Sequence, residues 1–483
     1  MSRLVKIAAL LLALIAMPLF AEDDDGRFEL KYARNLPFHG GRVTIDHSFG
    51  DLVVRTHTGS DVQVRATIRS SDDEIGKEIR IVTSESGGVS IRTEYPEIRR
   101  HSGRLSFSVD MTVTVPANAP VTARNSFGNT DVRGLTSSVV ENKQGSITMQ
   151  DMRGAQLVSN SFGGVDVRDV RGALTVANQN GSIEVRKVEG AVNATNRFGS
   201  IELSDIRDGA TLVNANGAIE AMDIGGTLKA TNSFGNITAS TIAGTADLTS
   251  TNGRIEVSNV SGSAVVRDSF GTIVATTIRG TLTVDGENSK VDASGIGGQA
   301  TIDTSFGGVS LRDVGGAATV TSNNGNLKVS DVGGMLTAKT QFGSVQAERI
   351  RGAAQITSSN GSVTLNDIGA EVRVKNSFAG VFVTNVSGPV TVSNSNGAVS
   401  VSALRGSGCH PISLTTNFSS IKVALPDNAA YTVNARTSFG RINTDFPITT
   451  TTIGDQALSG TIGRGGCRMD LNNMNGNITI ARE

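Results

Sequence analysis

Four acidic side chains recur at intervals of eighteen residues and are the first candidates for chemistry: Asp166, Glu184, Glu202 and Glu220. If eighteen residues form one layer of a stacked β-structure, these carboxylates lie about 5 Å apart, near the separation that retaining glycosidases use. Oxygen ligands at this spacing would also suit calcium better than zinc. Arg168 and Arg186 follow two of the acids by two residues and could offset the repulsion between stacked charges. We favour pairing with these arginines and with solvent, and the alternative is a bound cation or a basic partner.

A second acidic column lies three residues further along each interval: Asp151, Asp169, Asp205, Asp223, Asp313, Asp331 and Asp367. Each of these residues begins a D-[IVM]-x-G turn or a close variant of one, where Asp commonly bonds to its own backbone. Because the same residue type recurs in so many copies, a structural role in the turn is favoured over catalysis.

The remaining residues offer little context for catalysis. The five histidines are scattered, and none lies in an HExxH or triad pattern: His39, His47, His57, His101 and His410. The chain has no Trp and three Tyr, and most of its 17 Phe belong to the repeat, which argues against sugar cleavage and strong sugar binding. Phe382 is expected to point outward and is a candidate for a contact patch.

Cys409 and Cys467 are the two cysteines of the chain. In an exported protein an even number of cysteines confined to one segment predicts a disulfide bond. Neither cysteine has the CxxC or Cys-His spacing of a metal or redox site. The sequence therefore predicts no cofactor and no metal centre.

The elements that position these side chains form a repeat with fifteen anchors from Gly145 to Gly397, all of them Gly except Ser289 and Ala379. The second, fourth and seventh residues after each anchor are apolar. Apolar residues at i and i+2 are typical of strands, and paired glycines in each repeat would be costly in a helix.

Two short strands cannot bury their apolar face alone, so the copies must stack. We therefore predict an all-β protein, a parallel β-solenoid (β-helix) with 18-residue coils and about sixteen of them. One inward column is expected to contain residues from five successive coils: Val165, Ile183, Ile201, Ile219 and Ile237.

A longer period of thirty-six residues appears just before the anchors, where Phe and Asn alternate, as in Phe162, Asn180 and Phe198. Two positions earlier a polar column begins with Asn142 and Asn160. Rings in every coil would have to stack at strand spacing, whereas alternation lets each ring lie over a smaller neighbour. We interpret both columns as scaffolding of the turn, and the alternative is a ligand surface.

The chain divides into four predicted segments. Residues 1–21 have the positive start and apolar stretch of a signal peptide, which predicts export to the periplasm or the cell surface. Residues 22–124 are a β-rich N-terminal cap, residues 125–405 the solenoid, and residues 406–483 a C-terminal cap with a degenerate repeat. No second long apolar run follows, so no integral membrane anchor is expected. A net charge of −1 gives no support to nucleic-acid binding.

The repeat and the closing segments resemble a known family. The exported start, the G-x-I-x-V-x-[DN]-[VI]-x-G coils and the closing patterns S-x-I-x-V-x-L-P, T-S-F-G-R-I and N-G-N-I-T-I are similar to bacterial β-strand-repeat envelope proteins called putative adhesins. The resemblance implies the solenoid fold over nearly all of the mature chain. It transfers no catalytic residue, since the family is itself of unknown function.

From these observations we predict a non-catalytic, monomeric structural or binding module of the cell envelope, adhesin-like, that binds an extended polysaccharide or protein. The first alternative is a polysaccharide-active enzyme of the β-helix type. Such an enzyme should interrupt the repeat with loops that build a cleft, yet these coils keep their spacing. The second alternative is a periplasmic sensor or assembly factor.

Overall fold

The computed structural model describes residues 28–97, 105–405 and 410–483. The chain forms two compact units, residues 1–226 and 227–483. The predicted signal peptide, residues 1–21, lies outside the described residues, and so does Cys409. Both units are built from parallel β-coils, so the predicted all-β solenoid is confirmed.

In the first unit each coil contributes two strands, and each strand pairs in parallel with its equivalent in the next coil. β12 (Gln156–Phe162) pairs with β14 (Leu174–Asn180), and β13 (Val165–Arg171) pairs with β15 (Ile183–Val188). The other coil strands of this unit are β8 (Val121–Phe127), β9 (Thr130–Arg133), β10 (Ser138–Gln144), β11 (Ile147–Arg153), β16 (Val192–Phe198), β17 (Ile201–Ile206), β18 (Ala210–Asn216) and β19 (Ile219–Ile224). From β10 and β11 onward the equivalent strand lies eighteen residues later, whereas β8 and β9 pair with β10 and β11 at an offset of seventeen.

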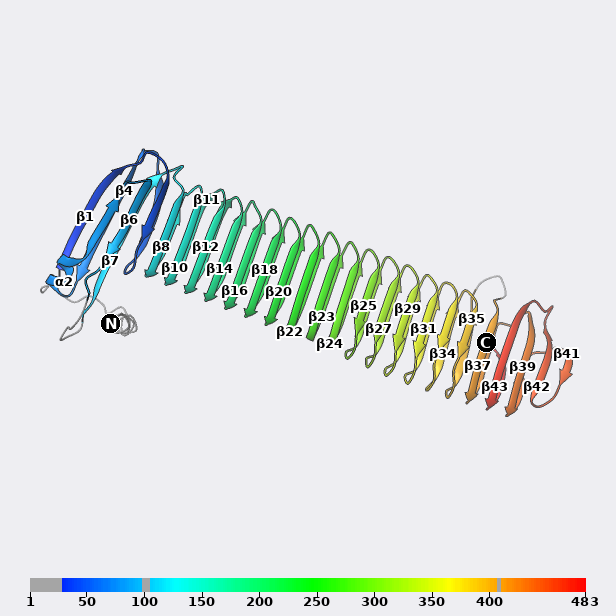
Figure 1. Ribbon diagram of the computed structural model, residues 1–483. Helices are drawn as coiled ribbons and strands as arrows, with labels where there is room; N and C mark the ends of the chain where they lie inside the picture. The colour runs from blue at the N-terminus through cyan, green and yellow to red at the C-terminus, as the bar shows by residue number, and fades with distance from the viewer. Residues whose placement is uncertain (1–27, 98–104, 406–409) are drawn as a thin grey trace. The chain divides into compact units, whose positions relative to one another are not determined.

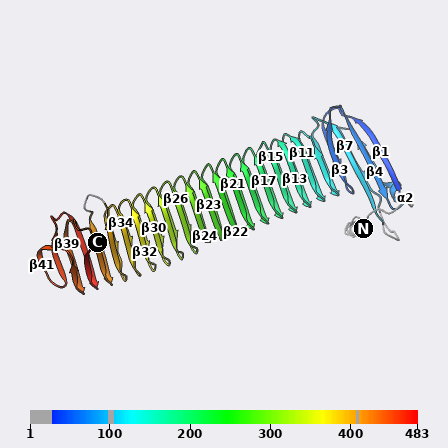
Figure 2. The same cartoon turned by 180° about the vertical axis from the view of Figure 1, so that it is seen from behind.

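The paired strands form two sheets that face each other across the core. One sheet contains β8, β10, β12, β14, β16 and β18 (Figure 1), and the other, with β11, β13, β15 and β17, is labelled in the view from behind (Figure 2).

The second unit continues the same plan, and in three of its coils one long strand bends through both sheets. These long strands are β22 (Ala246–Val260), β23 (Ala264–Ile278) and β24 (Leu282–Ile296). The other coil strands are β20 (Leu228–Phe234), β21 (Ile237–Ile242), β25 (Ala300–Thr304), β26 (Val309–Val314), β27 (Ala318–Ser322), β28 (Leu327–Val332), β29 (Leu336–Thr340), β30 (Val345–Ile350), β31 (Ala354–Ser358), β32 (Val363–Ile368), β33 (Val372–Lys375), β34 (Val381–Val386), β35 (Val390–Ser393) and β36 (Val399–Leu404).

The core is a set of apolar columns, one residue from each coil. Val165, Ile183, Ile201 and Ile219 are fully buried and lie opposite one another on successive strands. The predicted inward column is therefore confirmed in the first unit. Ile237 belongs to the second unit, where it is buried and pairs with Ile255.

The polar column is also buried and bonds to the turns. The side-chain amide of Asn160 donates to the backbone oxygens of Gly145 and Gly163, each at 3.0 Å. In the second unit Ser322 donates in the same way to Gly307, at 3.1 Å. Each such bond satisfies an anchor carbonyl inside the coil, so the interpretation of this column as turn scaffolding is confirmed.

Backbone torsion and the close approach of the preceding coil favour glycine at the anchors. Gly163 has φ of 117°, in the left-handed region that favours Gly, and a Cβ there would lie 2.4 Å from the oxygen of Gly145 in the preceding coil. Gly181 repeats this arrangement against Gly163, at 2.3 Å.

The N-terminal segment joins the stack. β2 (Arg42–Asp46) and β3 (Leu52–His57) pair in parallel with β8 and β9. The remaining elements of this segment are β1 (Phe28–Pro37), β4 (Asp61–Ser70), α2 (Asp73–Glu78), β5 (Arg80–Ser84), β6 (Gly88–Glu94) and β7 (Phe107–Pro116). β4 pairs antiparallel with both β1 and β7.

In the C-terminal segment the strand order departs from the chain order that the repeat predicts. β43 (Cys467–Asn475) lies between β37 (Ile412–Phe418) and β39 (Tyr431–Phe439). β44 (Ile478–Arg482) likewise lies between β38 (Ile421–Leu425) and β40 (Ile442–Thr444). The chain can return in this way because β41 (Ile448–Ile453) and β42 (Ala457–Ile462) form an antiparallel pair.

Adjacent glycines provide a matched test of the anchor geometry. We expect Gly163→Ala to lower the free energy of unfolding by about 2 kcal/mol or more, because it adds left-handed strain to a backbone clash. Gly164→Ala should have little effect, since its nearest contacts would be at 3.8 Å. Urea unfolding of both variants measures the difference, and equal losses would contradict the assignment of the anchor.

Candidate functional site

The acidic column lies on the outward side of one sheet in the first unit. Asp166 is opposite Glu184, Glu184 is opposite Glu202, and Glu202 is opposite Glu220. β13, β15, β17 and β19 carry one member each, between two buried core residues. The structure therefore brings together all four residues that the sequence singles out.

Asp166 and Glu184 have cationic partners. Arg168 pairs with Asp166 at 2.8 Å and with Glu184 at 3.8 Å, and Arg186 also contacts Glu184. Glu202 instead accepts a 2.9 Å hydrogen bond from the hydroxyl of Ser200. Within the described part of the chain, no ion pair is formed by Glu202 or Glu220.

The column provides no cage for a cation. Across residues 28–97, 105–405 and 410–483, no three His, Cys, Asp or Glu side chains gather in a group that could hold a metal ion. Calcium prefers six to eight oxygen ligands. The arginines therefore account for one half of the column, and the other half is a pair of solvated carboxylates.

The backbone conformation explains why Asp recurs in the second acidic column. Asp169 has φ of 56° and Asp331 has φ of 60°, and the equivalent residue of nearly every coil is also left-handed, including Lys187 and Thr241. Asp and Asn tolerate this conformation better than other non-glycine residues. This conformation agrees with the predicted structural role in the turn.

Three carboxylates of this column, those of Asp169, Asp331 and Asp367, pair with cations from other coils. Asp169 pairs with Lys187 at 2.6 Å, and Arg405 contacts Asp367 at 2.7 Å. Arg349 binds both carboxylate oxygens of Asp331, at 2.6 and 2.9 Å, and these hydrogen bonds lower the pKa of Asp331.

Phe382 is exposed, as expected from its place between Val381 and Val383. Its ring lies over Gly380, where a Cβ would come within 2.8 Å of the ring carbons. Its cross-strand neighbours are Thr364 and Ser400. One exposed ring among short polar side chains is a small contact surface.

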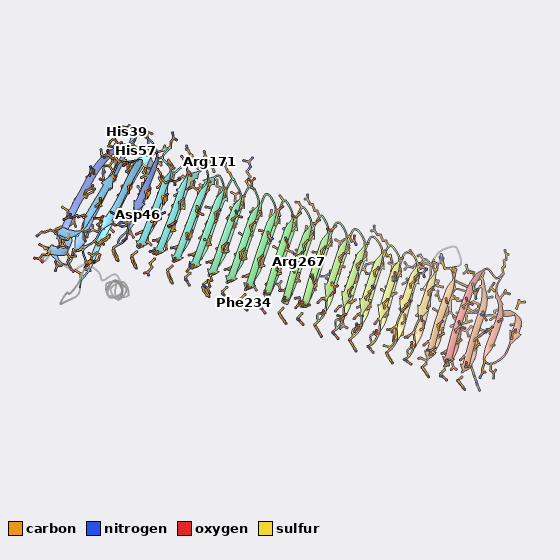
Figure 3. All side chains as sticks on the ribbon, in the orientation of Figure 1. His39, Asp46, His57, Arg171, Phe234 and Arg267 are labelled. Carbon is orange, nitrogen blue, oxygen red and sulfur yellow. The ribbon has the colours of Figure 1, made fainter. Side chains whose placement is uncertain are left out.

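The structure corrects the interpretation of the phenylalanines that precede the anchors. These side chains are not packed inside the turn. Between 45% and 71% of each residue's surface is exposed: Phe162, Phe198, Phe234, Phe270, Phe306, Phe342, Phe378, Phe418 and Phe439. Phe234 lies at an edge of the ribbon in Figure 3. The signal that could have revealed them is the small or polar character of the residues next to each ring in the sequence, since none of these residues is a large apolar side chain that could cover it.

His47 and His57 lie in different surroundings within the described part of the first unit. His47 is buried in the first unit, and its Nδ1 lies 3.4 Å from the hydroxyl of Thr93. Burial lowers its pKa to about 4, against the opposing effects of hydrogen bonds to the Val109 and Gly50 backbone and of the Asp110 and Asp51 charges. His57 lies apart, near Asp61.

Cys467 is disulfide-bonded and begins β43. Cys409 lies outside the described residues, so its pairing with Cys467 stays a prediction. No helix in the described part of the chain has both the length and the apolar character needed to span a membrane.

Residues 319–481, about a third of the chain, match the family described as Toastrack DUF4097, and the predicted resemblance is confirmed over these residues. No curated protein matches the chain.

Solved structures with a related arrangement are only distantly similar. A putative adhesin from Bacteroides fragilis NCTC 9343 is 12% identical and covers 55% of this chain and 97% of its own, with a TM-score of 0.23. A putative adhesin from Parabacteroides merdae ATCC 43184 is 9% identical and covers 58% and 95%, with a TM-score of 0.21. A putative cell adhesion protein from Clostridium sporogenes ATCC 15579 is 6% identical and covers 94% and 100%, with a TM-score of 0.17.

The buried histidine predicts acid sensitivity of the first unit. Because the pKa of His47 is lowered on folding, the unfolded chain binds the proton first, and stability present above about pH 6.5 is lost as the pH falls towards 4. We expect this group to contribute a loss of about 1.4 kcal/mol per pH unit in that window. When urea unfolding is measured at several pH values, His47→Gln should flatten the dependence of the unfolding free energy on pH. An unchanged slope in His47→Gln would refute this assignment.

Replacing acids of the column by Gln should change the stability of the fold differently, depending on whether the acid is paired with arginine. Glu202→Gln combined with Glu220→Gln should stabilise the protein by some tenths of a kcal/mol, because these carboxylates repel each other without a cationic neighbour. Glu184→Gln should not stabilise it, since this change removes a partner of Arg168 and Arg186. Thermal unfolding at low salt tests this, and high salt should shrink both effects. Stabilisation by Glu184→Gln alone would contradict the assigned pairing.

Proposed function

We propose that this protein is an exported, non-catalytic binding module of the cell envelope, adhesin-like, that holds an extended polysaccharide or protein along its coils. The observation that carries the proposal is a pair of outward hydroxyl columns on an uninterrupted register in the second unit. One column is Ser240, Ser258, Thr276 and Ser294, and the other is Thr283, Thr301, Thr319 and Thr337.

These columns repeat at a constant step. The side chains are directly opposite one another on successive parallel strands, which lie about 4.8 Å apart. Hydroxyl groups both donate and accept hydrogen bonds, so a row of them suits the hydroxyls of a sugar chain or the amides of an extended peptide. A linear partner can use many equivalent contacts, and each contact can be weak.

The enzyme alternative has one observation in its favour. Glu202 and Glu220 lie on adjacent strands without a cationic partner in the described residues, and stacked carboxylates approach the separation used by retaining glycosidases. However, β17 and β19 keep the eighteen-residue register, and no inserted loop builds a wall beside the two acids. A cleft that positions a sugar and excludes water is what such chemistry needs.

The proposed function predicts that binding depends on hydroxyl groups. Purified protein is tested on a glycan array and in capture from envelope extract, beside two sets of variants. One set is Thr301→Val, Thr319→Val and Thr337→Val, and the other is Ser258→Ala, Thr276→Val and Ser294→Ala. We expect one set to reduce binding at least tenfold while the other does not, because one sheet carries the partner. The triple change of Glu184, Glu202 and Glu220 to Gln serves as a third set for the acidic face.

Two results would contradict the proposal. Release of reducing sugar ends from envelope polysaccharide, lost on Glu202→Gln, would show the enzyme alternative. Cell fractionation that finds the uncleaved chain only in the cytoplasm would exclude an envelope role.

A further inference from the structure

Seven of the exposed phenylalanines belong to the second unit and form what we call the phenylalanine ladder: Phe234, Phe270, Phe306, Phe342, Phe378, Phe418 and Phe439. Their exposed fractions are 51–71%. A regular series of large exposed apolar side chains marks an interaction surface more often than isolated ones do.

The rings of the ladder alternate with Asn in space. Phe234 is opposite Asn252, and Asn252 is opposite Phe270. At the C-terminal end the chain order is broken, yet β43 brings Asn475 between Phe418 and Phe439. The alternation is therefore a property of the folded surface and not only of the sequence period.

Each Asn leaves a slot between two rings. Consecutive rings are two strand spacings apart, or about 9.6 Å. The side chain of Asn360 is held back against the coil, where its amide donates to the backbone oxygen of Gln341 at 3.1 Å.

The first unit shows what fits such a slot. Phe49, between β2 and β3, forms an isolated parallel bridge with Phe127 of β8, and their rings stack with centroids 5.0 Å apart and planes 2° from parallel. Rings on adjacent coils are thus compatible with this fold, so the alternation is not forced by steric crowding. A ring inserted between two ladder rings would lie about 4.8 Å from each, which reproduces the stacking distance of this pair.

The central stretch of the strip around the ladder is uncharged, whereas Arg254, Glu287, Lys290 and Arg441 lie in the strip outside this stretch. From Phe306 to Phe378 the residues directly before the rings and their Asn neighbours are Ser, Asn or Gln, and those two positions after are Gly, Asn or Ser. In an interface between two identical copies related by a twofold axis, each surface meets itself, so a charged strip would place like charges face to face. Between Phe306 and Phe378 these positions also contain no Lys or Arg, which removes the usual attraction to anionic lipid there.

We propose that the ladder binds a second copy of this chain, in an antiparallel pair in which six of the seven rings of each copy enter the six slots of the other. A second copy has the same step by construction, so rings and slots match when the copies are offset by one strand spacing. About 100 Å² of each ring is exposed, so six inserted rings supply on the order of 600 Å² per copy, the larger part of the 800 Å² per partner of a stable interface. This dimer goes beyond the proposed function and replaces the monomer expected from the sequence.

Sedimentation velocity and light scattering of the purified protein test the pairing over a range of micromolar concentrations. We expect the parent to have twice the mass of one chain. Phe270→Ser, Phe306→Ser and Phe342→Ser together should give a monomer, since the rings are exposed and their loss should leave the coils folded. Phe382→Ser, a change of an exposed ring outside the ladder, should leave the dimer intact.

Filling the slots provides the decisive variant. Asn288→Phe, Asn324→Phe and Asn360→Phe close three slots with rings from the same copy, and we expect this more apolar protein to be monomeric. If the filled variant associates as strongly as the parent or more strongly, the ladder is merely adhesive and the proposal is wrong. A parent that is monomeric at every concentration overturns the proposal, and loss of binding to a glycan or a vesicle in the ring-removal variant would then assign the ladder to that partner.

Discussion

The close approach of neighbouring coils at the anchor glycines constrains the rest of this structure. At Gly163 and Gly181 the backbone of one coil leaves no room for a Cβ on the next, and left-handed torsions turn the chain there. Every coil must therefore turn at the same place, and its strands must begin in the same register. The buried Asn column follows from this turn, because the inward anchor carbonyls need donors.

Because of the same constraint, equivalent residues of successive coils line up in columns. Once the register is constant, the third residue after each anchor is always outward and the second always inward. Charges, hydroxyls and rings then recur at one strand spacing or two. The three surface features of this protein, the acidic column, the hydroxyl columns and the phenylalanine ladder, differ in composition but arise from this one geometry.

Much of the fold could be predicted from the sequence, because apolar residues at a period of two within a repeat of eighteen leave few alternatives. The stacking of Asp166, Glu184 and Glu202 follows directly from that register. The left-handed torsions at Lys187 and Thr241 could not be read in the same way, since neither residue type favours them and only neighbouring coils reveal the turn. The position of β43 between β37 and β39 depends on contacts between segments far apart in the chain, which a degenerate repeat does not specify.

The exposure of the ladder was missed for a different reason. A Phe that recurs in a repeat is compatible with the core and with the surface, and the period alone does not say which side of a turn a ring occupies. The small polar residues around Phe306 and Phe342 carry the missing information, because nothing there can cover a ring. The low aromatic content of the chain therefore does not describe the surface of the second unit, where seven exposed rings form the ladder.

The central claim is that eighteen residues advance the second unit by one strand spacing, in every coil. Electron spin resonance distances between labels on outward positions test it most directly, with Thr238→Cys paired first with Ser310→Cys and then with Ser400→Cys. These pairs are four and nine repeats apart in the sequence, so the account predicts separations of about 19 and 43 Å between the labelled backbones. Separations that do not grow in proportion to the number of repeats would contradict it.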